Sequence, residues 1–247
     1  MSIEIKHNEP IQLNIPKFIC DGGLAEHLEG HPMLSHLNAY TFDVFCGKPG
    51  SGKTSLVIGM LTGKKIKRVY RKVFNHILVV MPQTSIQSMV KNPFKNHDQS
   101  KIYEDLDLPT IQSIYDRLVS SSEEGESSLL ILDDCGASLK DKHIQKLFRK
   151  IIYNRRHLKC KIVCLVQSFL SLPKEIRKLL TNIVSFKPSK VEFQNLFDEC
   201  FESSKDLCMD IMNIAYDIPH SWLLLNVDNQ RIFKNDGSEI VIHPEEK

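Results

Sequence analysis

The segment that most constrains this chain is Gly47-Lys48-Pro49-Gly50-Ser51-Gly52-Lys53-Thr54, which fits the pattern Gly-x-x-x-x-Gly-Lys-Thr at every fixed position. A short β-prone run, residues 41–46, precedes it, and a helical pattern begins near Gly52. Glycines let such a loop wrap so that successive backbone N–H groups point inward, and the helix N-terminus adds a dipole that favours an anion. The segment therefore predicts a phosphate-binding loop inside a strand–loop–helix unit.

The side chains of this loop have separate expected roles. Lys53 is expected to reach the β and γ oxygens of a nucleoside triphosphate and to act in catalysis, and Thr54 is expected to ligate Mg²⁺. We therefore expect ATP and Mg²⁺ as the ligands. The residues expected to contact the nucleotide are Gly47, Lys48, Pro49, Gly50, Ser51, Gly52, Lys53, Thr54 and Ser55.

Two acids and an amide follow later apolar runs. Asp133 and Asp134 come directly after residues 129–132, and a buried strand that ends in an acid places that acid at the crevice where open α/β sheets bind ligands. We expect Asp133 to hold Mg²⁺ through water and Asp134 to polarise the attacking water, although Glu fills that role more often. Gln167 follows the run 162–166 and is expected to act as a catalytic sensor, because its neutral amide can hydrogen-bond the γ-phosphate or the water.

The order of the apolar runs predicts the fold class. Continuous apolar runs separated by helical segments suit a mainly parallel central sheet flanked by helices, and with the phosphate loop this is the α/β architecture of a P-loop NTPase. A terminal β-hairpin is expected after the last two helices. The strands are expected at 41–46, 77–81, 129–132, 162–166 and 183–186, the helices at 84–91, 109–122, 140–156, 189–203 and 205–216, and the hairpin at 222–233.

The chain is expected to form one domain with appendages. Its 247 residues are enough for one large α/β domain and a sizeable core. We place the P-loop ATPase domain at residues 41–235. Residues 1–40 contain scattered prolines and glycines and are expected to form an irregular N-terminal extension with room for one edge strand. Residues 236–247 are expected to form a C-terminal tail.

Charge limits how the chain could meet a nucleic acid. The 32 Lys and Arg residues nearly balance the 30 Asp and Glu residues, so contact with phosphates must come from local basic patches. Two clusters qualify, residues 64–72 and residues 149–157, and either could follow a phosphate backbone. The second cluster lies in sequence between the strands expected at 129–132 and 162–166, which both end in candidate catalytic residues. This favours a position in which the cluster faces a neighbouring subunit or the nucleotide.

Cysteines and hydropathy indicate the compartment. The seven cysteines are odd in number, scattered and mostly inside apolar runs, which is typical of reduced thiols in a cytosol-like compartment. Glu4 and Lys6 put an acidic and a basic residue where a signal peptide needs an apolar core, and no run of about 18 apolar residues occurs, so we expect neither a signal peptide nor a membrane-spanning helix.

With these residues in place, the chain resembles the genome-packaging ATPases of the nucleocytoplasmic large DNA viruses, the poxvirus-like branch of the FtsK/HerA translocases. The likeness covers about residues 41–235. The residues just before and just after the strand expected at 162–166 distinguish this family from others, because the phosphate loop is common to many families. Besides that loop and the two acids, the likeness rests on Asn154-Arg155-Arg156-His157, Gln167, Leu172-Pro173, Arg177 and Asn182.

The resemblance implies a RecA/FtsK-like fold and a ring of subunits that uses ATP to thread double-stranded DNA into a preformed capsid. The implied partners are double-stranded DNA, further copies of the chain, and viral capsid or capsid-vertex proteins. The implied location is the host cytoplasm, in a viral factory, or the virion. The resemblance also makes Arg177 a candidate catalytic arginine finger on the neighbour's ATP, with Arg155 and Arg156 as competitors.

Two other functions share the phosphate loop. A small-molecule or nucleotide kinase is one, although such kinases usually begin at the loop and carry an arginine-rich lid, whereas 46 residues precede the loop here. A nucleotide-gated assembly protein that binds ATP without hydrolysing it is the other. ATP turnover measured alone, with DNA, and with candidate phosphate acceptors separates the three.

Overall fold

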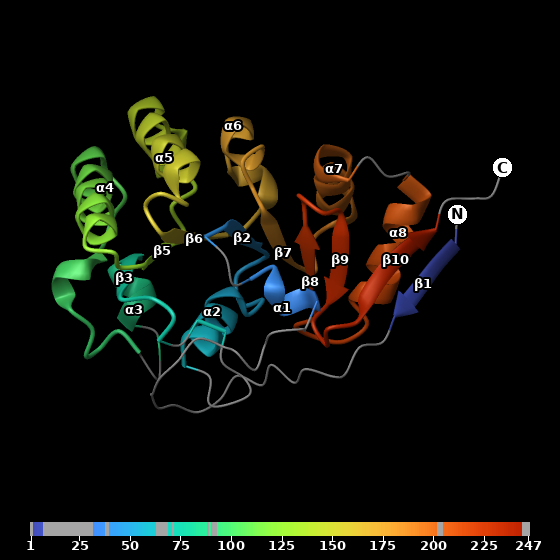
Figure 1. Ribbon diagram of the computed structural model, residues 1–247. Helices are drawn as coiled ribbons and strands as arrows, with labels where there is room; N and C mark the ends of the chain where they lie inside the picture. Colours follow the sequence, from blue (N-terminus) through green and yellow to red (C-terminus); the bar gives the residue numbers. More distant parts are fainter. Residues whose placement is uncertain are drawn as a thin grey trace.

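The computed structural model of the chain describes residues 2–6, 32–37, 40–62, 69–70, 72–87, 89, 93–201 and 205–243. The basic cluster predicted at 64–72 lies largely outside these ranges, as does most of the N-terminal extension. Within the described residues, the secondary structure forms a single sheet with helices on both faces, as Figure 1 shows.

The sheet has ten strands in the order β1-β10-β9-β8-β7-β2-β6-β5-β3-β4. The strands from β4 to β7 in this order pair in parallel, and β8, β9, β10 and β1 add an antiparallel extension. The predicted fold class and the β8–β9 hairpin are therefore confirmed. The strands are β1 Ser2–Lys6, β2 Phe42–Cys46, β3 His76–Val80, β4 Ile102–Tyr103, β5 Ser128–Asp133, β6 Cys160–Val166, β7 Asn182–Phe186, β8 Trp222–Asn226, β9 Arg231–Lys234 and β10 Glu239–His243.

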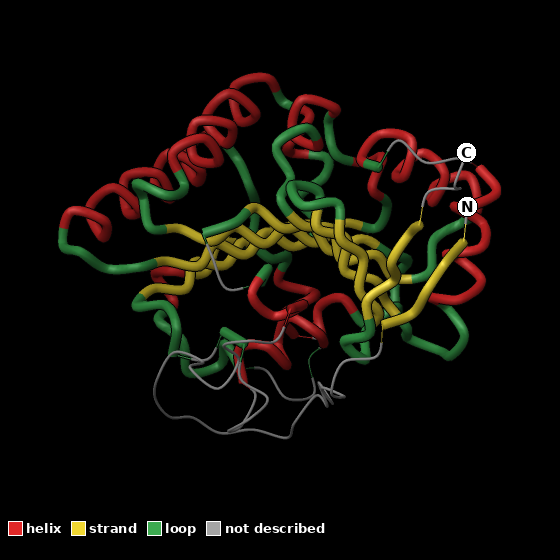
Figure 2. The backbone as a smooth tube through the Cα atoms, turned by 45° about the vertical axis from the view of Figure 1, so that its right-hand side comes forward, coloured by secondary structure: helices red, strands yellow, loops and turns green. Residues whose placement is uncertain are grey.

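The helices divide between the two faces of the sheet, above and below it in Figure 2. Helices α4 to α8 cover one face, and α1, α2 and α3 lie on the other. They are α1 Pro32–Ser35, α2 Lys53–Thr62, α3 Gln83–Gln87, α4 Leu108–Glu123, α5 Lys142–Asn154, α6 Lys174–Arg177, α7 Lys190–Cys200 and α8 Lys205–Ala215. No helix within the described ranges has both the length and the apolar character needed to cross a membrane.

Side-chain alternation along the strands builds a core on each face. Phe42 and Val44 of β2 pack among the α4–α8 helices, whereas Phe45 packs with Leu56 and Met60 of α2 on the other face. Successive strand residues point to opposite faces, so one fully buried strand serves both cores. This double burial explains why the central strands read as continuous apolar runs.

The sheet continues beyond residue 235. Residues expected to form a C-terminal tail contain β10, which pairs with β9 on one side and with β1 on the other. Ile240 of β10 is only 3% exposed and joins the core. Residues 239–243 are Glu-Ile-Val-Ile-His, a run of three apolar residues between two polar ones, which is too short to indicate a strand by itself. In the N-terminal extension, α1 contributes Met33 and Leu34, both fully buried, to the core that also contains α2.

Candidate active site

The phosphate loop connects the carboxyl end of β2 to the start of α2. Gly50 and Gly52 have φ angles of 75° and 108°, a region that residues with a Cβ rarely adopt. A Cβ atom on Gly47 would lie 2.7 Å from the Cβ of Phe186 and 2.9 Å from Oγ of Ser51. The loop therefore needs glycine at these positions for its conformation and for its packing against β7.

Lys53, the first residue of α2, is 9% exposed. Its ammonium donates to the backbone oxygens of Gly47, at 2.5 Å, and Lys48, at 3.1 Å. Burial lowers the pKa of Lys53, and the nearby charge of Asp133 opposes that shift. The loop thus holds a partly desolvated cation over its own opening, where a phosphate oxygen would gain a strong electrostatic partner.

Asp133 ends β5 close enough to Lys53 for the two charges to interact. Its carboxylate accepts a long hydrogen bond of 3.5 Å from Oγ1 of Thr54, and the residue is 8% exposed. Burial, followed by repulsion from Asp134, raises the pKa of Asp133 to about 6, against the attraction of Lys53. A hydroxyl and a buried carboxylate from two different elements fit Mg²⁺, which binds oxygen ligands and keeps several waters.

The raised pKa of Asp133 predicts a pH-dependent cost to the fold. The native state binds this proton more tightly than the unfolded chain, so the contribution of Asp133 to stability falls as pH rises from about 4 to about 6. In metal-free buffer, Asp133→Asn is therefore expected to raise the free energy of unfolding by up to about 3 kcal/mol at pH 7. Urea denaturation at pH 7 and pH 4 measures this gain, which should vanish at pH 4. A variant less stable than the parent at pH 7 would contradict it.

Asp134 and Gln167 lie together beyond the strand ends. Asp134 has a φ angle of 56°, a left-handed backbone conformation that turns the chain out of the sheet. Its N–H donates to the Leu165 oxygen of β6 at 3.2 Å. Nε2 of Gln167 donates to Oδ1 of Asp134 at 3.3 Å. Both side chains are exposed, so they are accessible to water and to a ligand.

Strand register explains why these residues meet. Cys46 of β2 pairs with Val166 of β6, and Leu165 of β6 pairs with Asp133 of β5. The phosphate loop, the two acids and Gln167 therefore leave the same edge of three adjacent parallel strands. The structure brings them together as the spacing predicts; their individual roles stay predictions.

Arg177, by contrast, is engaged within its own subunit. Its guanidinium donates to both carboxylate oxygens of Glu199, at 3.0 and 3.1 Å from Nε, and also to the Leu172 oxygen. The guanidinium carbon lies 5.2 Å from the ring centroid of Phe169, and the side chain is 11% exposed. To act on a neighbour's nucleotide, Arg177 would have to leave these partners.

The competing arginines lie at the other edge of the sheet. Arg155 follows α5, just before the amino end of β6, and Nε donates to the Tyr40 oxygen at 3.0 Å. The expectation that the second basic cluster faces the nucleotide is therefore wrong for Arg155 within its own subunit, because the phosphate loop lies at the carboxyl ends of the strands. The alternative, that the cluster faces a neighbouring subunit, stays a prediction. Arg156 and His157 are exposed at the same edge as Arg155.

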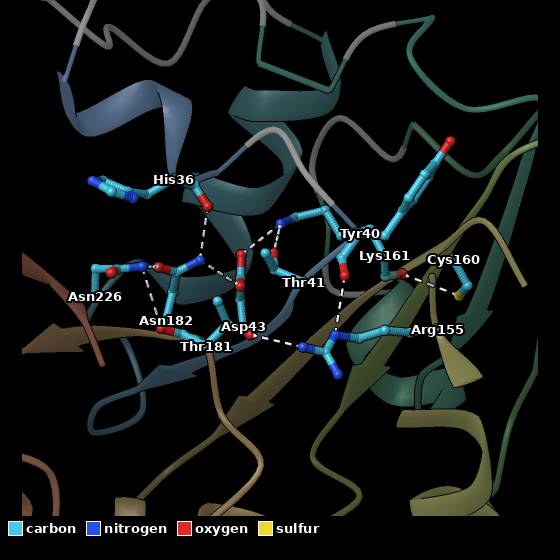
Figure 3. Close-up of polar contacts among 10 residues, drawn as sticks. All are labelled: His36, Tyr40, Thr41, Asp43, Arg155, Cys160, Lys161, Thr181, Asn182 and Asn226. Atoms are coloured by element: carbon cyan, nitrogen blue, oxygen red, sulfur yellow. Dashed lines mark hydrogen bonds and ion pairs between the residues drawn. The ribbon is translucent and has the colours of Figure 1, made fainter. Parts of the chain in front are cut away.

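A buried polar cluster occupies that opposite edge, and Figure 3 shows its members. Nζ of Lys161 lies 2.7 Å from Oδ2 of Asp43, and both side chains are fully buried. Nδ2 of Asn182 donates to Oδ1 of Asp43 and to the His36 oxygen, each at 2.8 Å, and Asn226 donates to Asn182 at 2.7 Å. The cluster joins four strands and the residues after α1, so it holds the sheet together far from the phosphate loop.

Sequence reasoning missed a second wall of the site. A cavity of about 430 Å³ adjoins the phosphate loop, lined by Lys48–Ser51, Phe186–Lys187 and Tyr216–Ser221. The last segment connects α8 to β8 and matches no motif. A turn containing Pro219 was the only signal in the sequence, and it does not specify a ligand.

A family comparison adds independent evidence. The family model described as Poxvirus A32 protein matches residues 34–242, which is most of the chain and includes every residue of the site above. Comparison with curated proteins gave no match.

Solved structures share the fold. The DNA-packaging ATPase B204 from Sulfolobus Turreted Icosahedral Virus has a TM-score of 0.60 at 16% identity, over 83% of this chain and 100% of that chain. The genome packaging NTPase B204 from Sulfolobus turreted icosahedral virus 2, solved with ATP-gammaS, has a TM-score of 0.57 at 15% identity, over 79% of this chain and 96% of that chain. At such identities the likeness establishes the architecture.

Proposed function

Since the chain belongs to the poxvirus A32 family of genome-packaging ATPases, we propose that it couples ATP hydrolysis to the movement of double-stranded DNA into a viral capsid. The observation that carries the proposal is the meeting of the phosphate loop, Asp133, Asp134 and Gln167 at one edge of the parallel sheet. In this proposal the loop binds the phosphates of ATP, and the three polar residues beside it hold the metal ion and activate the attacking water.

Each residue of the site has a chemical task in this proposal. The loop amides and Lys53 bind and orient the phosphates, with Lys53 exchanging its bonds to the loop carbonyls for phosphate oxygens. Thr54 and Asp133 would hold Mg²⁺, which neutralises charge on the phosphates. Asp134 accepts the proton of the attacking water, and Gln167, bonded to Asp134, positions that carboxylate.

Helix α5 offers a surface for the DNA backbone. Between Lys142 and Asn154 it carries five basic residues, counting His143, and no acidic residue. Its outer side and α4 line a groove of about 680 Å³ that includes Lys146, Arg149 and Lys150. Nearby, Tyr153 is 59% exposed. A surface of one charge sign beside an exposed aromatic ring suits a phosphate backbone better than it suits a neutral protein partner.

The α5 surface predicts the response to charge reversal. We expect DNA to stimulate ATP turnover without sequence preference, with affinity falling steeply as salt rises. Lys146→Glu with Lys150→Glu should remove most of the stimulation and lower the salt slope of DNA binding by about two, while turnover without DNA is unchanged. Lys95→Glu with Lys190→Glu, also exposed lysines, is the matched control. An equal loss of DNA stimulation in both double variants would mean that DNA binding depends on the net charge of the protein rather than on the α5 surface.

Assembly into a ring would place one subunit's arginine on the next subunit's nucleotide. Arg177 remains our candidate for this trans arginine finger, with Arg156, exposed in the structure, as the main competitor. Mixing Arg177→Ala subunits with Lys53→Ala subunits tests it, because a trans finger requires turnover to reappear although neither variant is active alone. If Arg177→Ala instead keeps the parental rate but unfolds at lower temperature, its role is the ion pair with Glu199.

The remaining partners follow from family membership. We propose contacts with capsid or capsid-vertex proteins and a location in the host cytoplasm or the virion. The kinase and the gated assembly protein are the alternatives that membership in an ATPase family disfavours. ATP turnover that required an added phosphate acceptor would revive the first, and tight binding without turnover, with or without DNA, would revive the second.

A further inference from the structure

We propose that the cavity between the phosphate loop and the segment Tyr216–Ser221 binds the base and ribose of the nucleotide, with Ile218 and Pro219 as the apolar surface for the base. This inference rests on the proposed function, since it extends the same site. It assigns residues in the α8–β8 connection, a part of the chain that carries no nucleotide motif.

Strand order gives the direction in which the nucleotide lies. The groups that act on the terminal phosphate, Asp133 and Gln167, follow β5 and β6, which lie on one side of β2. On the other side of β2 lie β7 and β8, and the cavity is built from the end of β7 and the residues that lead into β8. A triphosphate whose last phosphate reaches Asp133 therefore extends its nucleoside end towards the cavity.

The cavity wall is fixed before any ligand binds. Tyr216 is buried and donates to the Ser185 oxygen at 3.0 Å, while Lys234 lies 3.4 Å from the Asp217 carboxylate. His220 adopts a φ angle of 63°, and its Nδ1 lies 3.1 Å from the Ser51 oxygen of the phosphate loop. The segment is thus anchored at both ends and joined to the loop, as a preformed ligand pocket requires.

The exposed residues at the centre of this wall suit a purine. Ile218 is 61% exposed, one of few large apolar side chains so exposed in the described part of the chain, and Pro219 follows it. An aromatic base stacked there would cover this apolar area. Lys187 and Asp217, both exposed and lining the same cavity, supply a donor and an acceptor for ribose hydroxyl groups. The volume of about 430 Å³ falls within the usual range for small-ligand sites.

The test compares two ligands that differ only in the nucleoside. Dissociation constants are measured by calorimetry for ATP and for inorganic tripolyphosphate, both with magnesium, on the full chain. Ile218→Ala should weaken ATP binding by about fivefold and leave tripolyphosphate binding unchanged. Val191→Ala, at an apolar residue of α7 that is 72% exposed, should change neither.

The possible results separate this inference from the function beneath it. Equal weakening of both ligands in Ile218→Ala, or no change in either, overturns the assignment of the cavity. Failure of the parent chain to bind either ligand overturns the phosphate-loop function itself. Lys53→Ala should weaken both ligands, because its partner is the phosphate chain that they share.

Discussion

Lys53→Ala is expected to abolish ATP turnover, lowering the rate by at least about a thousandfold, and to weaken nucleotide binding. The ammonium of Lys53 is buried at the mouth of the loop and bonded only to backbone oxygens in the described structure, so its removal leaves the transferring phosphate without its main cationic partner. Phosphate release measured at saturating ATP gives the rate.

Two observations complete that experiment. Because burial already lowers the pKa of Lys53, losing its charge should cost the fold little, and the melting temperature should stay close to the parental value. Lys6→Ala, on edge strand β1 at the far end of the sheet, should keep full turnover. Hydrolysis at the parental rate in Lys53→Ala would mean that the loop does not bind the reacting phosphates.

Asp134→Asn is expected to slow hydrolysis by about a hundredfold to a thousandfold while leaving affinity for magnesium-ATP unchanged. Asparagine keeps the size and tolerates the left-handed backbone at this position, where φ is 56°, but it cannot accept the proton of the attacking water. Single-turnover hydrolysis together with equilibrium ATP binding separates the two effects.

Asp141→Asn is the matched control, because Asp141 is the next acid along the chain. Its Oδ1 accepts hydrogen bonds from the backbone of His143 and Ile144, and these bonds lower its pKa. Asparagine caps a helix about as well, so turnover and stability should both hold. If Asp141→Asn loses activity and Asp134→Asn does not, the base has been assigned to the wrong acid.

The sequence predicted the parallel half of the sheet well and the antiparallel half incompletely. Strands buried on both faces read as unbroken apolar runs, so β3, β5 and β6 could be located to within two residues. Edge strand β1 and its neighbour β10 are less buried: Glu4 and Lys6 of β1 are exposed, and most of β10 is half-buried. Their signal depends on pairing with each other across almost the whole chain, which local patterns cannot reveal.

The active site was likewise predicted from the sequence only in part. The phosphate loop, Asp133 and Gln167 follow recognisable strands, so parallel topology alone predicts that they meet. The segment 216–221 reaches the loop only through the antiparallel addition of β8 to β7, which no motif indicates.

Asn182 and Arg177 show that the sequence can also suggest a site residue without revealing its contacts. Both residues carry the family resemblance, but each is bonded to a partner within the fold. Asn182 binds Asp43 in the buried cluster, and Arg177 binds Glu199. A residue typical of a family can thus also make contacts that maintain the fold, which the sequence does not reveal; whether Arg177 acts in trans as well stays a prediction.

Movement along DNA is the central claim, and displacement of a triplex-forming strand tests it most directly. A labelled third strand is placed on a long duplex far from a free end, and its release is followed with ATP and magnesium. The account predicts release that requires ATP hydrolysis, is delayed in proportion to the distance from the end, and is absent with Lys53→Ala. Robust DNA-stimulated hydrolysis without any release would contradict translocation and leave an ATPase that binds DNA but does not move along it.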